Sequence, residues 1–194
     1  MRPPHLVARA LARLGVIALL VATACSGGGA PRAQAPPSPT PTPTATVAFS
    51  LSSPLVRAGR AYPRRYTCRE DDLSPSLTWE GVPERAVELA VVLDDPDAGD
   101  FVHWGMWGIS PERASLAEDE VPAGAHQVFN DNGQADYSGP CFPDRTGHRY
   151  RVTLYALSVP LPLRPGATVP QLRAALRGRT IATATLEAKG YVFR

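Results

Sequence analysis

Four segments of the chain carry the hydrophobic patterns of β-strands. Residues 149–157 alternate polar and apolar side chains with a period of two, and residues 102–109 are rich in aromatic and β-branched residues. Residues 87–93 form a mostly apolar run that ends at a turn, and residues 180–187 are rich in threonine and β-branched side chains. These segments predict a mainly β protein.

One segment has the pattern of a helix. Residues 169–176 place Pro170 in the first turn, and Gly178 stands just beyond the end. The segments between the expected elements hold many of the chain's 16 glycines and 21 prolines, which favour turns. We therefore predict one domain over residues 47–194, a β-sandwich of two packed sheets with a helix near the C-terminus.

Residues 1–24 have the pattern of a secretory signal. A basic region precedes a short apolar segment, residues 14–22, which is too short to span a bilayer as a stable helix. Small residues then lead to Cys25, and this arrangement resembles the bacterial lipobox, in which the cysteine is lipidated. We expect a lipoprotein signal peptide and a lipid anchor on Cys25; an ordinary secretory signal cut near Ala24 is the alternative.

Residues 25–46 contain almost no side chain that a core could bury. Apart from Cys25, they are mostly glycine, proline, threonine, serine and alanine, a composition that cannot offset the entropy lost on ordering. We expect the lipidated cysteine to be followed by a disordered tether. The domain would then be extracytoplasmic and lipid-anchored to the bacterial cell membrane.

The net charge of +2 comes from the N-terminal part of the chain. Residues 1–46 hold four arginines and no acid, so 16 basic residues face 18 acidic ones in residues 47–194, a net charge of −2. The bases of residues 47–194 are scattered along the sequence, unlike the clustered bases of a nucleic-acid-binding face. We expect no nucleic-acid partner.

Two cysteines remain if Cys25 carries lipid. Cys68 and Cys141 form an even pair in a secreted domain, which is typical of a disulfide, although two free buried thiols satisfy the same count. The chain has no C-x-x-C motif, so redox catalysis has little support.

Two clusters carry most of the candidate chemistry. Residues 94–100, DDPDAGD, precede His103 and Trp104, and residues 137–143, YSGPCFP, precede His148. Each histidine stands at the start of a predicted strand, just after a loop that contains glycine or proline. Loops held by a rigid sheet are where binding sites are usually built.

Three chemistries fit these clusters poorly. A calcium loop starting at Asp95 needs glycine at position six and glutamate at position twelve, where the chain has Asp100 and Met106. A metal site from His103, His148 and a carboxylate lacks short ligand spacing. A serine hydrolase needs an activated serine in a G-x-S-x-G motif, and the chain has Y-S-G-P there. We expect no metal and no cofactor.

An anion pocket is the fourth chemistry. Imidazoles and the backbone N–H groups of a glycine-containing loop are good phosphate donors. Asp95 has the wrong charge for contact with phosphate, but a carboxylate beside an imidazole fixes its tautomer and favours the imidazolium. The alternative is that each histidine is an ordinary strand residue with a satisfied hydrogen bond. The spacing alone leaves both open.

The two clusters resemble the signature regions of the phosphatidylethanolamine-binding protein family, also called Raf kinase inhibitor-like proteins. The first signature, D-P-D-A-P followed by H-W, is similar to residues 95–99 and 103–104. The second, G-P-C-P-P followed by T-G-x-H-R-Y and a strand ending in L-Y-A-L, is similar to residues 139–157. Residues 74–79, SPSLTW, are similar to the S-P-x-L-x-W stretch of the bacterial branch. The resemblance runs from about Phe49 to the C-terminus.

The resemblance implies a fold and a site. The fold is a β-sandwich of two antiparallel sheets with a C-terminal helix, and the site is a small cavity that binds phosphate, acetate or a phosphorylated headgroup. Asp97 and Trp104 would support the cavity, and six residues would line it: Asp95, His103, Gly139, Pro140, His148 and Tyr150. The resemblance also implies that Cys68 and Cys141 are the paired cysteines of the bacterial branch.

We therefore expect a membrane-tethered, non-enzymatic protein whose anion pocket binds phosphate, a phosphate-bearing small molecule or a lipid headgroup. The family also implies an alternative, an inhibitor of a protease or kinase that acts through protein contacts. An enzyme acting on phosphate esters, with His103 and His148 as general acid and base, is a second alternative.

Overall fold

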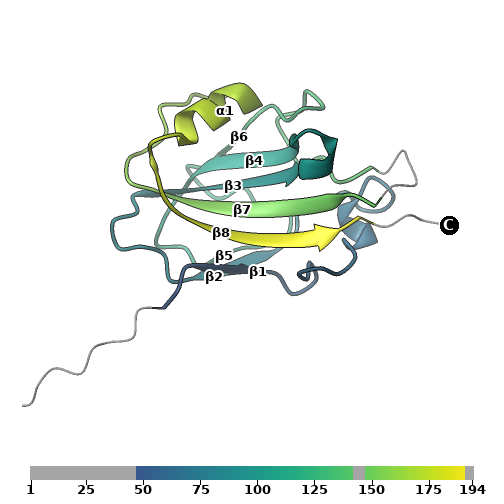
Figure 1. The fold of residues 1–194 in the computed structure, drawn as a ribbon. Helices are drawn as coiled ribbons and strands as arrows, with labels where there is room; N and C mark the ends of the chain where they lie inside the picture. Colours follow the sequence, from purple (N-terminus) through teal and green to yellow (C-terminus); the bar gives the residue numbers. More distant parts are fainter. Residues whose placement is uncertain (1–46, 142–146, 191–194) are drawn as a thin grey trace, which may run out of the picture. The chain divides into compact units, whose positions relative to one another are not determined.

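Two antiparallel sheets and one helix form three layers in the computed structural model, which describes residues 47–141 and 147–190. Figure 1 shows the helix, α1 (Val169–Leu176), on one side of the larger sheet and the smaller sheet on the other. The larger sheet has the order β6-β4-β3-β7-β8, with β3 Glu88–Asp95, β4 Phe101–Ile109, β6 His126–Gln127, β7 Arg149–Leu157 and β8 Thr180–Lys189. The smaller sheet has the order β1-β2-β5, with β1 Ser50–Ser52, β2 Leu77–Glu80 and β5 Ser115–Leu116. Two short 3-10 turns, η1 Arg64–Tyr66 and η2 Pro96–Ala98, complete the described elements.

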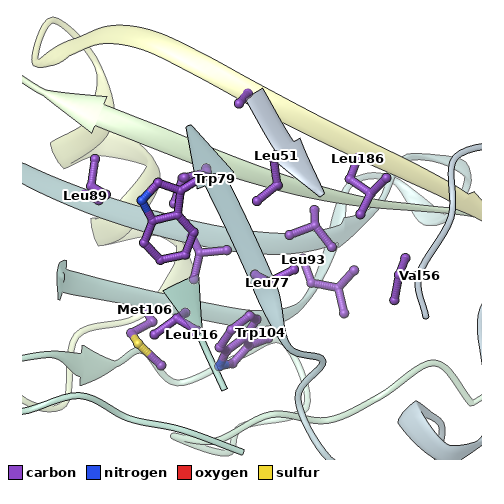
Figure 2. Packing of buried hydrophobic residues seen from close by; sticks show 14 of the residues in the cluster. Leu51, Val56, Leu77, Trp79, Leu89, Leu93, Trp104, Met106, Leu116 and Leu186 are labelled. Carbon is purple, nitrogen blue, oxygen red and sulfur yellow. The ribbon is translucent and has the colours of Figure 1, made fainter. Parts of the chain in front are cut away.

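The larger sheet separates two hydrophobic cores. The first core fills the space between the sheets, where Trp79 and Leu77 of β2 pack with Leu93 of β3 and Trp104 of β4 (Figure 2). The second lies between the larger sheet and α1, and includes Leu172 of the helix. Because both faces of β3 are covered, all eight of its residues are buried. This explains why β3 reads as a nearly continuous apolar run.

The helix begins where its sequence pattern predicts. Thr168 and Gln171 form a capping box, in which the backbone N–H of Thr168 donates to the Gln171 side chain at 2.9 Å. Pro170 stands in the first turn, where its missing N–H costs nothing. The face that carries Leu172 and Leu176 is buried against the larger sheet.

The predicted fold class is confirmed. The strands expected over residues 87–93, 102–109, 149–157 and 180–187 correspond to β3, β4, β7 and β8, and the helix has the predicted bounds. The smaller sheet was not predicted strand by strand, because strands of two to four residues offer too few alternating positions. The predicted signal peptide, tether and Cys25 anchor lie outside the described residues, and the domain bounds stay predictions. No helix in the described residues has the length and apolarity to cross a membrane.

Candidate functional site

Three strand ends meet at one end of the larger sheet. β3 ends at Asp95, and β4 and β7 both run antiparallel to it on either side, so both begin beside that end. Asp95 lies opposite Phe101, the first residue of β4, and Asp94 lies opposite Arg151 of β7. Residues from distant parts of the chain are therefore gathered by strand pairing.

A cavity of about 180 Å³ opens at this meeting point. Among the described residues, five of the eight expected at the site line it, together with four others. The five are Asp95, His103, Gly139, His148 and Tyr150, and the four are Ala98, Phe101, Asn132 and Cys141. The two strands that flank β3 each contribute a ring: those of His103 and Tyr150 meet edge to face with centroids 5.5 Å apart.

Asp95 orients its neighbours and is itself almost fully buried, with its side chain 4% exposed. Its Oδ1 atom accepts hydrogen bonds from the backbone N–H groups of Asp97 at 3.0 Å and Ala98 at 3.1 Å. Its Oδ2 atom accepts from Nδ1 of His148 at 2.5 Å. A carboxylate in this position fixes the tautomer and the orientation of the imidazole ring. The pair therefore holds an oriented imidazole on the cavity wall.

The turn after Asp95 explains the proline and the glycine of the acidic cluster. Asp95 is the N-cap of η2, and Pro96 occupies the first position of the turn. Gly99 ends the turn in the left-handed region, with φ of 71°. The family signature has a proline at this place, and proline cannot adopt a positive φ, so the glycine permits a turn of this shape.

His103 is an extra residue in the ladder of β4. Leu93 pairs with Trp104 and Asp94 pairs with Val102, so the register skips His103. A β-bulge of this kind changes the direction of neighbouring side chains. Here His103 lines the cavity while the next residue, Trp104, enters the core between the sheets.

The loop after β6 holds both the backbone and the ring of His103. The backbone oxygen accepts from the Ser138 N–H at 3.1 Å and from the Asn130 side-chain amide at 3.2 Å. The ring atom Nδ1 lies 3.0 Å from the carbonyl oxygen of Ser138. Burial lowers the pKa of His103, and the Ser138 carbonyl and the nearby Asp95 carboxylate offset only part of that effect.

On the outer side of the same strands, charged residues form what we call the outer clamp: Asp94, Asp97, Arg149 and Arg151. Arg149 donates from Nη2 and Nε to the carboxylate of Asp97 at 2.7 and 3.0 Å. Arg151 donates in the same way to Asp94 at 2.6 and 2.9 Å, and also reaches Asp100 at 3.2 Å. The hydrogen bonds from Arg149 lower the pKa of Asp97 to about 2. The acidic turn is thus neutralised by alternate residues of β7.

Three of the expected site residues do not line the cavity. Asp97 belongs to the outer clamp, and Trp104 lies in the core, where its ring N–H donates to Gln127 at 2.6 Å. Pro140 is not a lining residue either; its carbonyl oxygen accepts the N–H of Cys68 at 3.4 Å. The backbone N–H of Gly139, which we expected to face an anion, instead donates to the Asp72 side chain at 2.8 Å. Of these four residues, Gly139 alone lines the cavity.

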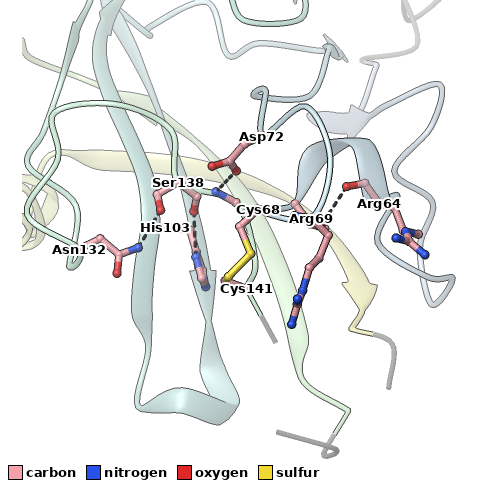
Figure 3. Close-up of a disulfide and its surroundings, with 10 residues drawn as sticks. Arg64, Cys68, Arg69, Asp72, His103, Asn132, Ser138 and Cys141 are labelled. Carbon is pink, nitrogen blue, oxygen red and sulfur yellow. Dashed lines mark hydrogen bonds between the residues drawn. A yellow bond between two sulfur atoms is a disulfide. The ribbon is translucent and has the colours of Figure 1, made fainter. Parts of the chain in front are cut away.

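A disulfide fastens one wall of the cavity. The predicted bond between Cys68 and Cys141 is confirmed, and Cys141 itself lines the cavity (Figure 3). The two connected segments also touch at Gly139, where an added Cβ would lie 2.2 Å from the Tyr66 carbonyl oxygen and 2.6 Å from Asp72. Only glycine permits this close approach.

Asn132 is a lining residue that the sequence analysis did not identify. Its side-chain amide donates to the hydroxyl of Ser138 at 2.7 Å, so the turn at residues 130–133 is fastened to the loop that holds His103. The available signal was the N-D-N-G turn at residues 130–133. A turn motif does not indicate which strand end it will cover, so the link to the cavity needed the structure.

The alternative chemistries find little support in the described residues. Within residues 47–141 and 147–190, no group of three or more His, Cys, Asp or Glu side chains is arranged to hold a metal ion. His103 meets the carbonyl oxygen of Ser138 and not its hydroxyl, so the pair lacks the serine–histidine contact of a hydrolase.

Comparison with known proteins identifies the family. The sequence profile described as phosphatidylethanolamine-binding protein matches residues 52–192, which is most of the chain. The chain belongs to this family. A UPF0098 protein of Methanothermobacter thermautotrophicus is 41% identical over 131 residues, which is 64% of this chain and 86% of that protein. None of these names is that of an enzyme.

Two solved structures share the fold of this phosphatidylethanolamine-binding family member. A homolog from Chlamydia trachomatis, CT736, is 36% identical with a TM-score of 0.68, over 73% of this chain and 96% of that one. YbcL of E. coli, described as a new member of the mammalian family, is 28% identical with a TM-score of 0.71, over 75% and 99% of the two chains. Both likenesses support the β-sandwich with its C-terminal helix.

A mycobacterial relative bears on localisation. LppC of Mycobacterium tuberculosis, named as a lipoprotein, is 45% identical over 130 residues, or 66% of this chain. The alignment spans about 64% of that protein's own length. The relative's name agrees with the lipobox-like cysteine, and Cys25 itself lies outside the described residues.

Proposed function

We propose that this protein is a lipid-anchored, extracytoplasmic binding protein without catalytic activity, and that its cavity takes up phosphate or a phosphate-bearing small molecule or headgroup. The observation that carries the proposal is the Asp95–His148 pair at the cavity wall. A protonated imidazole held in this way would donate a charged hydrogen bond to an anion in a partly desolvated place, where such a bond is strong. Cys25 would carry the anchor, and the partner would be the membrane surface or a small molecule near it.

The size and setting of the cavity also support the proposal. About 180 Å³ accommodates a phosphate group and a short substituent, but not a large substrate. The outer clamp leaves the arginines of β7 engaged with aspartates, and among the described residues that line the cavity the two histidines are the side chains able to carry positive charge. The family name refers to a phosphorylated headgroup, and the lipoprotein name of the mycobacterial relative supports the anchor.

Calorimetric titration of the full-length chain with inorganic phosphate and with phosphoethanolamine tests the proposal. In the His148→Ala variant the lost charged hydrogen bond should cost about 1.5–3 kcal/mol, or roughly 10- to 150-fold in affinity. His126→Ala is the matched control, because His126 lies on β6, is exposed and does not line the cavity. Affinity that His148→Ala leaves unchanged would refute the assignment.

Two alternatives give different results in related assays. Release of inorganic phosphate from phosphoethanolamine, lost in His103→Ala and His148→Ala, would support an enzyme acting on phosphate esters. Inhibition of a protease by a chain that binds neither anion would support inhibition through protein contacts. Neither alternative is favoured by a specific contact among the described residues.

A further inference from the structure

The disulfide between Cys68 and Cys141 lies at the surface of the domain. Both cysteines are exposed, although Tyr66 and Thr67, which stand just before Cys68, are completely buried. A thiol in solution can therefore approach the bond while the domain is folded. Structural disulfides of secreted proteins resist reduction, whereas exposed disulfides are typically the labile and regulatory ones. The exposure of this bond thus points to exchange chemistry beside its structural role.

The same bond belongs to the wall of the cavity. Cys141 lines the cavity together with Gly139. Ser138, in the same segment, lies with its carbonyl oxygen 3.0 Å from Nδ1 of His103 (Figure 3), and its N–H donates to the His103 backbone oxygen. The position of a cavity histidine therefore depends on a segment whose end is fastened by the disulfide.

Hydrogen bonds also join the two segments that the disulfide connects. In the described part of the chain they run from the Tyr137 hydroxyl to the Tyr66 carbonyl oxygen at 2.6 Å, from the Gly139 N–H to Asp72 at 2.8 Å, and from the Cys68 N–H to the Pro140 carbonyl oxygen at 3.4 Å. The last of these bonds, nearest the disulfide, is longer than an ordinary N–H···O bond. Reduction should therefore leave the buried start of the segment in place and loosen its end, Pro140 and Cys141, at the cavity.

We propose that the Cys68–Cys141 disulfide is a thiol-exchange site, that a dithiol reductant opens it in the folded protein, and that its reduction weakens anion binding in the cavity. The last part rests on the proposed function. In the exchange, a thiolate of the dithiol attacks one sulfur, the Sγ–Sγ bond breaks, and the other sulfur leaves as a thiolate. The second thiol of the reductant then attacks the mixed disulfide. The reductant leaves as a disulfide, and Cys68 and Cys141 together gain two electrons and two protons.

Anion binding and reduction are then coupled in both directions. We expect the reduced cavity to bind inorganic phosphate about tenfold more weakly, because a loosened wall must be ordered again when the anion binds. Saturating phosphate must favour the oxidised form by the same factor. For a two-electron couple, a tenfold change corresponds to about 30 mV in reduction potential. The anion would thus protect the disulfide that holds its own cavity.

The first experiment asks whether the folded protein exchanges. The oxidised full-length chain is treated with dithiothreitol, and alkylation followed by peptide mass spectrometry reports Cys68 and Cys141 separately from Cys25. We expect a rate proportional to the dithiothreitol concentration that changes by less than about twofold in urea below the unfolding transition. If global unfolding were needed to reach the bond, the rate would rise by roughly tenfold or more per molar urea. That result would overturn the inference.

The second experiment measures phosphate affinity by calorimetry. The oxidised chain is compared with the chain kept reduced by dithiothreitol and with the Cys68→Ser and Cys141→Ser double variant. The reduced chain and the double variant should both be folded by circular dichroism and should bind about tenfold more weakly. The double variant is the matched control, because dithiothreitol should not change its affinity. In a dithiothreitol redox buffer, saturating phosphate should shift the midpoint of reduction of the wild-type chain by about 30 mV.

The outcomes separate this inference from the proposed function. Equal phosphate affinity of the oxidised and reduced chains would overturn the inference and leave the proposed function standing. A reduced chain that is unfolded would also overturn it, because the loss of binding would then be a loss of fold. No phosphate binding by the oxidised chain would overturn the proposed function and with it the coupling, while the urea series still decides the exchange site. If the double variant does not fold, the reduced wild-type chain decides the coupling.

Discussion

Asp95 and Asp97 are two residues apart in one turn, yet the first faces the cavity and the second faces outward. The side chain of Asp95 is 4% exposed and hydrogen-bonds His148, whereas that of Asp97 is 33% exposed and pairs with Arg149. Their partners, His148 and Arg149, also lie on opposite faces, because consecutive residues of an extended chain point to opposite sides. What each aspartate does is set by the face on which it lies, and not by its residue type.

The same division applies along the start of β7. His148 and Tyr150 line the cavity, and Arg149 and Arg151 reach the aspartates of the outer clamp. An acidic turn with several aspartates would otherwise repel an anion. The clamp neutralises the outward carboxylates, and Asp95 is hydrogen-bonded to the histidine that it orients. This is how an acid-rich turn can border the phosphate site that we propose.

Breaking the disulfide should have the largest effect on stability. The bond holds the segment of Cys141, which lines the cavity, against the segment of Cys68. The Cys68→Ser and Cys141→Ser double variant opens a loop whose ends are 73 residues apart. The free energy of unfolding, measured with urea, should fall by about 4 kcal/mol. The double variant should be insensitive to reductant, unlike the wild type. A loss below about 1 kcal/mol would mean that the close packing at Gly139 holds the wall by itself.

Within the outer clamp, Arg151→Met should cost more stability than Arg149→Met. Arg151 pairs with Asp94, whose side chain is 11% exposed, and its loss leaves a nearly buried carboxylate without its main partner. We expect about 1–2 kcal/mol from urea unfolding for Arg151→Met. The Arg149 pair is more exposed and should contribute less. The reverse order would show that solvent exposure does not separate the two pairs.

A smaller effect is expected on the pKa of Asp97, which belongs to the outer clamp. Its pKa of about 2 lies below that of an unfolded aspartate, which is near 3.9. The contribution of this carboxylate to stability is therefore fully present above about pH 4 and is lost as the pH falls toward 2. The side-chain carbonyl shift of Asp97, followed by NMR, should show a midpoint near 2 and return toward 4 in Arg149→Met. An unchanged midpoint in that variant would exclude the Arg149 guanidinium as the cause, since the backbone N–H at this position is retained.

The sequence and the structure agree most closely where one face of an element is buried. β7 has the predicted bounds because its period of two is uninterrupted, and α1 has them because its cap is local. The disagreements arise from irregular backbone. The β-bulge at His103 sends Trp104 into the core, and no pattern of residue types revealed the extra residue. Asn132 reaches the cavity through a loop whose path depends on tertiary contacts.

The central claim is that the inward residues bind the anion and the outward residues brace the turn. Phosphate affinity, measured by calorimetry at pH 7 for Asp95→Asn and Asp97→Asn, tests it most directly, since each variant removes one negative charge. General electrostatics would strengthen anion binding in both variants, and more in Asp95→Asn, because Asp95 lines the cavity and Asp97 does not. We predict roughly tenfold weaker binding for Asp95→Asn, because the His148 imidazolium loses its carboxylate, and a change within about twofold for Asp97→Asn. Equal changes in the two variants would contradict the division of the turn into a binding face and a bracing face.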